Sequence, residues 1–407
     1  MTKAGTKSTK ASSRDRGRAR VGPLAAARSP AAVLDVDALL DDPGTGIIVC
    51  CGSGGVGKTT TAAALALRAA ERGRQVVVLT IDPARRLAQS MGIDQLDNTP
   101  RPVSGVGGGT RKKSGSLAAM MLDMKRTFDE VVESQASPEK ARQILTNPFY
   151  IALSSSFAGT QEYMAMEKLG QLHADAQREG TYDLIVVDTP PSRSALDFLD
   201  APERLSRFLD GRFVRLLLAP TKGPARLMSA GVGLVTGAVT KLIGAQVLRD
   251  MQTFVAAFDT LFGGFRQRAQ KTFELLQADK TAFLVVAAPE PDALREAAYF
   301  VERLNEDRMP LAGLIVNRAS PAPEGALSAD EAMAASVRLA QERPESVTAG
   351  LLRLHADRAR LVERETGLRA RFAAAHPSVP TAVVPALAGD VHDLAGLRQV
   401  GALLADG

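Results

Sequence analysis

A glycine-rich segment that ends in lysine and threonine has the residue types and spacing needed to hold phosphates. Residues 52–59 read GSGGVGKT, which fits the pattern GxxxxGKT. Glycines allow backbone conformations that turn successive N–H groups inward, and these groups form a concave anion site. We expect the Lys58 ammonium to reach the β- and γ-phosphates and the Thr59 hydroxyl to bind Mg²⁺. The sequence therefore predicts a nucleoside triphosphate site. Its predicted contacts are Gly54, Gly55, Val56, Gly57, Lys58, Thr59 and Thr60.

Two aspartates follow apolar runs and are the candidate carboxylates of this site. Asp188 closes the run YDLIVVD, the position of a Walker-B carboxylate, and we expect it to hold Mg²⁺ directly or through water. Asp82 follows QVVVLTI and precedes a proline, which stops the strand. A carboxylate there can orient or deprotonate the attacking water. The alternative for Asp82 is the N-cap of a helix beginning at Ala84, and the residues alone leave both roles open.

The segments that must position these residues are continuously apolar runs alternating with helical patterns. Such runs are typical of a parallel sheet covered by helices on both faces. Ligands bind such sheets beyond the carboxyl ends of the strands, so the glycine loop, Asp82, Asp188 and Asn317 should converge there. The expected strands are 47–51, 75–81, 117–122, 182–188, 281–288, 311–317 and 380–385. The expected helices are 31–43, 60–71, 125–178 with a break near 147–148, 202–278, 291–305, two within 328–374, and 393–404, and 101–116 is expected to be a loop.

Composition and charge divide the chain of 407 residues into a tail and a folded part. The net charge is +5, and eight of the basic residues lie within residues 1–30 among small and polar ones. Such a segment buries too little apolar surface to order itself, so we predict a basic, mostly disordered tail over 1–43 and a folded domain over 44–407. The tail could contact nucleic acid or anionic lipid at a membrane surface, or only aid solubility; we expect no specific nucleic-acid partner.

Cysteine usage and hydropathy indicate the cytoplasm. Cys50 and Cys51 are adjacent in the first strand and should face opposite sides of the sheet, which makes a disulfide or a shared metal between them unfavourable. No apolar segment typical of a secretory signal follows the tail. The apolar stretch 227–251 is interrupted by Lys241, so we expect no transmembrane segment.

Six segments in order and at matching spacing resemble the ArsA family, which contains the arsenite-pump ATPase and the ATPase that targets tail-anchored membrane proteins. They are SGGVGKTTT, IDPARRLAQSMG, YDLIVVDTPPSRSALDFL, AAPEPDALREAAYFVERLN, LIVNR and VVPALAGDVHDL. The resemblance covers about residues 44–404 and is closest in look to the paired ArsA-like ATPases of actinobacteria.

This resemblance implies a P-loop ATPase of α/β fold, with a helical subdomain inserted at about 202–278. It implies a dimer, homomeric or heteromeric, with nucleotide at the interface and ATP and Mg²⁺ as cofactors. On this basis Asp82 is the water-orienting carboxylate, Asn317 recognises adenine, and the loop from Pro385 covers the other side of the base. The alternative for Asn317 is a strand-end residue that caps a turn.

One departure from the family pattern concerns Ser53, which stands where the family has a signature lysine that reaches across the dimer. A missing cation of this kind can cost several orders of magnitude in rate. Arg85, Arg86, Arg193 or a lysine of a different partner chain could substitute. The cysteines through which arsenite activates the arsenite-pump ATPase have no counterparts in this sequence. The zinc-binding CxxC pair of eukaryotic relatives has none either.

Three functions follow as hypotheses. The first is a Mg²⁺-dependent ATPase, a nucleotide-switched dimer that couples hydrolysis to a hydrophobic client on helices 202–278, a partner protein or an anion pump. Those helices could equally pack only on their own core or on a dimer face. The second is a weakly hydrolysing, nucleotide-binding subunit of a heteromeric complex, which Ser53 favours. The third and most distant is a DNA-partitioning ATPase of the ParA type, which would bind DNA through its folded body.

Overall fold

The computed structural model describes residues 32–82, 86–106, 115–148, 150–151, 160–190, 264, 267–322 and 327–406. The basic tail predicted over 1–43 lies outside these residues up to Ala31. Most of the helical region predicted over 202–278 also lies outside them, although 267–277 are helical as expected. The apolar stretch 227–251 falls in the same gap.

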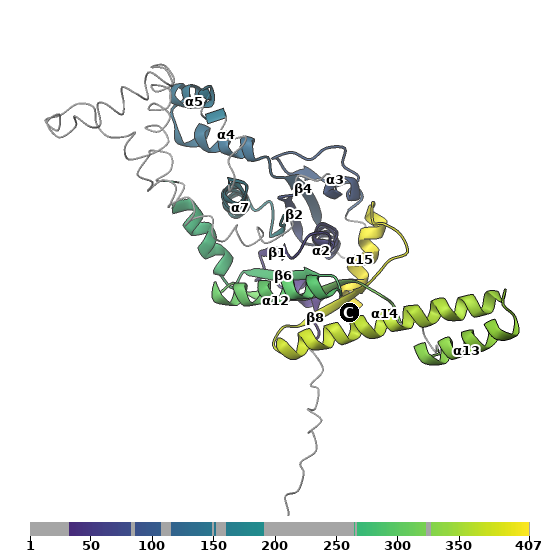
Figure 1. The fold of residues 1–407 in the computed structure, drawn as a ribbon. Helices are drawn as coiled ribbons and strands as arrows, with labels where there is room; N and C mark the ends of the chain where they lie inside the picture. Colours follow the sequence, from purple (N-terminus) through teal and green to yellow (C-terminus); the bar gives the residue numbers. More distant parts are fainter. Residues whose placement is uncertain are drawn as a thin grey trace, which may run out of the picture. The chain divides into compact units, whose positions relative to one another are not determined.

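Eight strands of the described chain form one sheet, in the order β3-β4-β2-β5-β1-β6-β7-β8 (Figure 1). All neighbouring pairs are parallel except β3 with β4, so the mostly parallel α/β sheet predicted from the sequence is confirmed. The expected loop 101–116 is wrong at its ends, because two residues pair there as an antiparallel edge strand and Ser116 opens the next strand. The strands are β1 (Ile47–Cys51), β2 (Gln75–Thr80), β3 (Arg101–Pro102), β4 (Ser116–Met121), β5 (Leu184–Asp188), β6 (Thr281–Ala287), β7 (Leu311–Ala319) and β8 (Thr381–Pro385).

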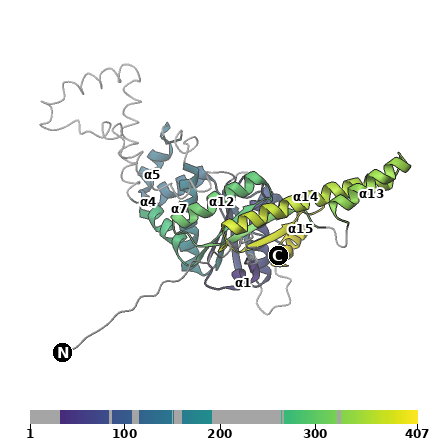
Figure 2. The ribbon, with the colours of Figure 1, turned by 60° about the horizontal axis from the view of Figure 1, so that its bottom comes forward.

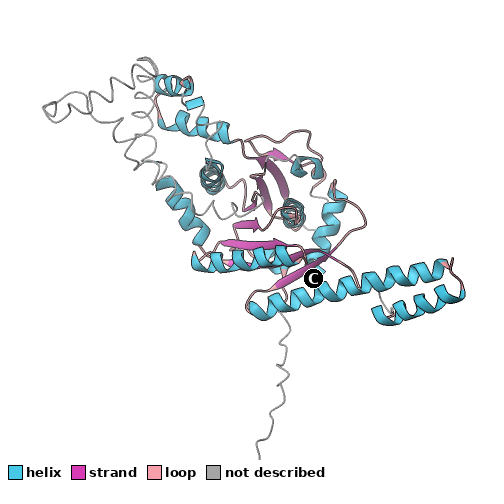
Figure 3. Ribbon diagram, in the orientation of Figure 1, coloured by secondary structure: helices cyan, strands magenta, loops and turns pink. Residues whose placement is uncertain are grey.

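Helices cover both faces of this sheet, as continuously apolar strands require (Figure 3). Alternate residues of each strand enter two separate apolar clusters, and the adjacent cysteines illustrate this: Cys50 lies in one cluster and Cys51 in the other. One face carries α1 (Val36–Asp41), α2 (Lys58–Glu71), α3 (Arg86–Ser90) and α15 (Leu394–Asp406). The other carries α4 (Met124–Gln135), α5 (Pro138–Leu145), α7 (Thr160–Glu179) and α12 (Pro291–Glu306).

The packed structure begins before residue 44, because α1 is part of the core. Val36 and Leu40 are fully buried, and the Asp35 side chain caps the helix by accepting the Ala38 N–H at 2.8 Å. Upstream of the helix, the Leu34 N–H donates to the Thr381 carbonyl at the start of β8. Ala31–Gly407 accordingly forms one compact unit, and a division at residue 44 falls inside it.

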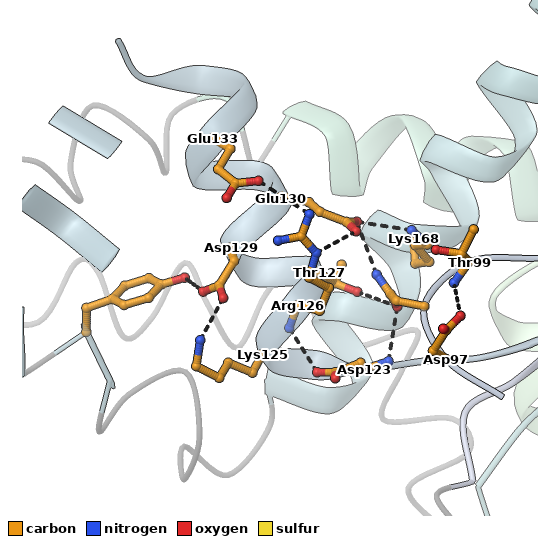
Figure 4. Close-up of polar contacts among 12 residues, drawn as sticks. Asp97, Thr99, Asp123, Lys125, Arg126, Thr127, Asp129, Glu130, Glu133 and Lys168 are labelled. Atoms are coloured by element: carbon orange, nitrogen blue, oxygen red, sulfur yellow. Dashed lines mark hydrogen bonds and ion pairs between the residues drawn. The ribbon is translucent and has the colours of Figure 1, made fainter. Parts of the chain in front are cut away.

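A polar network joins α4 and α7 to the loop between α3 and β3 (Figure 4). At its centre is the buried Asn98, whose amide donates to Glu130 at 3.1 Å. Its oxygen accepts the Asp123 N–H at 3.0 Å and the Thr127 hydroxyl at 3.1 Å. Lys168 of α7 pairs with the same Glu130 carboxylate at 3.1 Å. The network thus fixes where α4 begins and links it to α7.

The helices α13 (Ala329–Glu342) and α14 (Val347–Ala375) pack side by side as a hairpin (Figure 1; Figure 2). Ser336 of α13 donates to the Ala349 carbonyl of α14 at 2.7 Å. Near the other end of α14, Glu365 accepts two hydrogen bonds from Ser320, so the hairpin is tied to the end of β7. Within the described residues, no helix has both the length and the apolar character needed to cross a membrane.

Candidate functional site

The glycine loop joins the carboxyl end of β1 to the N-terminus of α2, the arrangement that the sequence predicts. α2 begins at Lys58, and its N-cap is Gly57 in a left-handed conformation with φ of 92°. Lys58 is buried and donates from Nζ to the Ser53 carbonyl at 2.8 Å, so the lysine crosses back over the loop. Burial lowers the pKa of Lys58, and the nearby Asp188 raises it.

Asp188 is the central carboxylate of the site and is fully buried. β5 lies between β1 and β2, and the register places Asp188 beside Cys50 on one side and Thr80 on the other. Its Oδ2 accepts a hydrogen bond of 2.8 Å from the Thr59 hydroxyl and another of 2.8 Å from the Thr80 hydroxyl. The two residues predicted to hold Mg²⁺, Thr59 and Asp188, are therefore in direct contact.

The donor set around Asp188 fits a magnesium ion. Carboxylate and hydroxyl oxygens are the ligands that Mg²⁺ takes in proteins. The Oδ1 atom of Asp188 is enclosed and has no hydrogen-bond partner among the residues that the structure describes, which is an unusual state for a buried carboxylate oxygen. Burial raises the pKa of Asp188 to about 6, and the hydrogen bonds from Thr59 and Thr80 oppose this rise. A cation or its bound water would satisfy the second oxygen.

Asp82 follows β2 at the same edge of the sheet. Its N–H donates to the Thr80 hydroxyl at 3.2 Å, and Thr80 in turn donates to Asp188. The negative charge of Asp82 acts on both Lys58 and Asp188. The structure thus places Asp82 close to the phosphate and metal residues. Pro83, Ala84 and Arg85 lie outside the described residues, so the alternative N-cap role is not tested.

Asn317 reaches the glycine loop from β7, although β6 separates β7 from β1 in the sheet. Its amide donates to the Val56 carbonyl at 2.8 Å, and its oxygen accepts the Arg318 N–H at 3.0 Å. An amide group has two donor hydrogens and two acceptor lone pairs, so capacity for one further donated and one accepted bond remains. That pairing matches the N6 and N7 positions of adenine. Pro385 ends β8 beside Ala319, at the same end of the sheet.

The sequence reasoning missed two residues of this region. Thr80 bridges Asp82 and Asp188, and the signal for it was a polar residue at the end of the apolar run of its strand. Arg318 donates to the Gly55 carbonyl at 3.1 Å, and only its position next to Asn317 pointed to it. Of the cations suggested to replace the signature lysine, Arg193 lies outside the described residues and Arg86 is exposed in α3.

Comparisons with known proteins identify the family of this chain and several of its relatives. A sequence model of the protein family described as anion-transporting ATPase matches residues 45–366 of this chain. This range includes every predicted site residue except Pro385. ATPase BagA of Mycobacterium tuberculosis is 24% identical over 371 residues, 87% of this chain and 91% of that protein. ATPase GET3C of Arabidopsis thaliana is 25% identical over 290 residues, 67% of this chain and 66% of that protein. An ATPase ASNA1 homolog of Cryptosporidium parvum is 26% identical over 267 residues, covering 66% and 63%.

Proposed function

This chain belongs to the ArsA family of ATP-hydrolysing enzymes, and we propose that its hydrolysis depends on Mg²⁺ held by Thr59 and Asp188. The observation that carries the proposal is the chain of contacts from Thr59 through Asp188 and Thr80 to Asp82. When bound, Mg²⁺ neutralises charge on phosphate oxygens. The protein's own part is to hold two metal ligands and a water-orienting carboxylate at the edge of one rigid sheet.

Within this site Lys58 and the loop N–H groups bind the phosphates, and Asp82 orients the attacking water. The buried ammonium of Lys58 provides positive charge where the transferred phosphoryl group develops negative charge. Thr80 holds the Asp82 main chain relative to Asp188, so the water-orienting and metal-binding groups keep one spacing. The products are ADP and inorganic phosphate.

Replacement of Asp82 by asparagine tests this assignment. The Asp82→Asn variant should bind ATP with an affinity near that of the wild type but lose turnover, because an amide cannot accept the proton of water. Lys58→Ala should instead weaken ATP binding itself, which makes it the matched control. Hydrolysis at the wild-type rate by Asp82→Asn would remove Asp82 from the mechanism. Hydrolysis that persists in EDTA would count against the metal requirement.

The base of the nucleotide is expected to be adenine. Asn317 supports this, since its amide is held in place by Val56 and Arg318 and retains one donor and one acceptor. Guanine presents an acceptor at O6 in place of the adenine N6 donor, so a bidentate contact made by adenine would be lost. Pro385 and the loop after it would cover the other side of the base. ATP should therefore compete with a fluorescent ATP analogue far better than GTP does.

We also propose a cytoplasmic dimer whose nucleotide state is coupled to a hydrophobic client, a partner protein or an anion pump. Family membership supports the dimer. The client surface was assigned from the sequence to helices 202–278, and residues 267–277 at its end are packed on α7 through Arg268 and Glu167 at 2.8 Å. The mass of the chain in solution with ATP and with ADP tests the dimer directly. A monomer in both states would contradict it.

A second candidate function is a weakly hydrolysing subunit of a heteromeric complex, and Ser53 favours it. Ser53 is buried, and its hydroxyl has no hydrogen-bond partner within the described parts of the chain. A short, enclosed side chain with a neutral hydroxyl cannot deliver a positive charge to a partner's nucleotide. On this reading the purified chain binds ATP tightly and turns it over only after a second ArsA-like chain is added. Brisk turnover by the purified chain alone would exclude it.

A further inference from the structure

Arg318 has a backbone conformation that arginine rarely adopts. Its φ is +62°, in the left-handed region that is unfavourable for residues other than glycine. The pairing of β7 with β8 shifts register between Asn317 and Ala319, so Arg318 is the extra residue of a β-bulge. Bulges at the ends of strands re-aim a side chain, and they are common beside functional sites. The contacts that the bulge gives to Arg318 and its neighbour Asn317 therefore bear on the site.

The bulge directs two neighbouring side chains onto two successive carbonyl groups of the glycine loop. Asn317 donates to the Val56 carbonyl at 2.8 Å, and the Arg318 guanidinium donates to the Gly55 carbonyl at 3.1 Å. In a regular strand, adjacent side chains point to opposite faces, so both could not reach one loop. The Asn317 oxygen also accepts the Arg318 N–H at 3.0 Å, which stabilises the left-handed residue.

The two contacts bear on phosphate binding through the geometry of the peptide group. In a planar trans peptide, the carbonyl of one residue and the N–H of the next point in opposite directions. A donor that holds the Gly55 carbonyl on one side therefore directs the Val56 N–H to the other side. Likewise, the contact to the Val56 carbonyl directs the Gly57 N–H. Successive N–H groups turned the same way are what form an anion-binding concavity.

We propose that Asn317 and Arg318 act together as a clamp that presets the phosphate-binding loop, and that Arg318 is its positioning residue for the nucleotide triphosphate. This rests on the proposed ATP site and deepens it. Because Asn317 also faces the base, the clamp ties base recognition to the loop that holds the phosphates. Arg318 acts through the loop backbone and needs no contact with the nucleotide.

The chain offers a matched control for testing this clamp. Arg308 also has a positive φ, of 56°, and is exposed in the turn after α12. Glycine adopts this conformation without penalty, so Arg318→Gly and Arg308→Gly each remove one guanidinium and one backbone strain. Only Arg318→Gly removes a donor from the glycine loop. The measurements are the dissociation constant for a fluorescent ATP analogue, with ATP as competitor, and the thermal midpoint of each variant.

Arg318→Gly should weaken ATP binding about tenfold, the size expected for loss of one charge-assisted hydrogen bond, with an unchanged or raised thermal midpoint. Arg308→Gly should bind like the wild type, and Arg318→Lys should restore part of the affinity. Wild-type ATP affinity in Arg318→Gly would overturn the clamp. So would an equal loss of ATP affinity in Arg308→Gly, or a loss of affinity in Arg318→Gly that is accompanied by a lowered thermal midpoint. Failure of the wild-type chain to bind ATP would instead count against the proposed function.

Discussion

A methyl group added at Gly57 should disable the nucleotide loop for two separate reasons. The first is backbone strain, since Gly57 has φ of 92° and alanine is disfavoured there. The second is a collision, because a Cβ atom would lie 2.3 Å from Nδ2 of Asn317. No rotation of the short Asn317 side chain is expected to relieve this and also keep its hydrogen bond to Val56. Gly57→Ala is therefore expected to distort the loop and to displace Asn317, the proposed base-binding residue, at the same time.

The size of the effect can be worked from these two terms. The left-handed conformation costs alanine about 1–2 kcal/mol. Displacement of the Asn317 amide leaves the Val56 carbonyl without that donor, which costs about 1–3 kcal/mol for a buried group. Together the two terms give about 2–5 kcal/mol, which corresponds to a roughly 30- to 4,000-fold loss of ATP affinity if the loop turns to relieve the strain. Any part of the cost that stays in the folded protein should lower its stability instead.

Gly55→Ala is the matched control in this experiment. Gly55 also has a positive φ, of 77°, but a Cβ atom there would meet nothing within 4 Å. This variant should therefore show only the strain term, about 1–2 kcal/mol. The assay is competition with a fluorescent ATP analogue, together with urea unfolding, for each variant. A double-mutant cycle of Gly57→Ala with Asn317→Ala should show coupling, because removal of the asparagine amide removes the collision.

Two results would refute this reasoning. The first is equal losses in Gly55→Ala and Gly57→Ala, since the collision would then contribute nothing. The second is simple additivity of Gly57→Ala and Asn317→Ala, which would mean that the two residues do not act on each other.

Three further predictions concern the metal residue and the packing. Thr80→Val should lower Mg²⁺-dependent turnover at least about tenfold, because Asp188 loses one of its two hydrogen bonds, and it should have little effect on ATP binding without Mg²⁺. A titration of turnover with Mg²⁺ checks this, and a titration curve equal to that of the wild type would contradict it. Asn98→Ala should lower the free energy of unfolding by about 2–3 kcal/mol, measured in urea, and a loss under about 0.5 kcal/mol would show that the polar network adds little. Deletion of residues 1–43 removes the buried side chains of α1 and should cost about 3–6 kcal/mol, whereas deletion of 1–31 should cost little; equal losses would contradict the role given to α1.

Most of the sheet and the positions of its site residues could be predicted from local patterns. Each buried strand was expected within a few residues of its observed bounds, because a strand buried on both faces is a continuous apolar run. The segment 101–116 was predicted as a loop because glycines and charges dominate it. The two-residue strand at Arg101–Pro102 is defined by its pairing with β4, and such a short segment carries no pattern of its own.

The sequence by itself determined, to within a few residues, where each buried strand ends, and therefore that the glycine loop, Asp82, Asp188 and Asn317 lie at one edge of a parallel sheet. A parallel arrangement brings all carboxyl ends to the same side, so their order along the chain suffices. Only the tertiary structure decided which atoms meet: Thr80 with Asp188, Asn317 with Val56, and Arg318 with Gly55. These contacts depend on strand order, register and one bulge, which join segments up to 263 positions apart in the chain and leave no local pattern in the sequence.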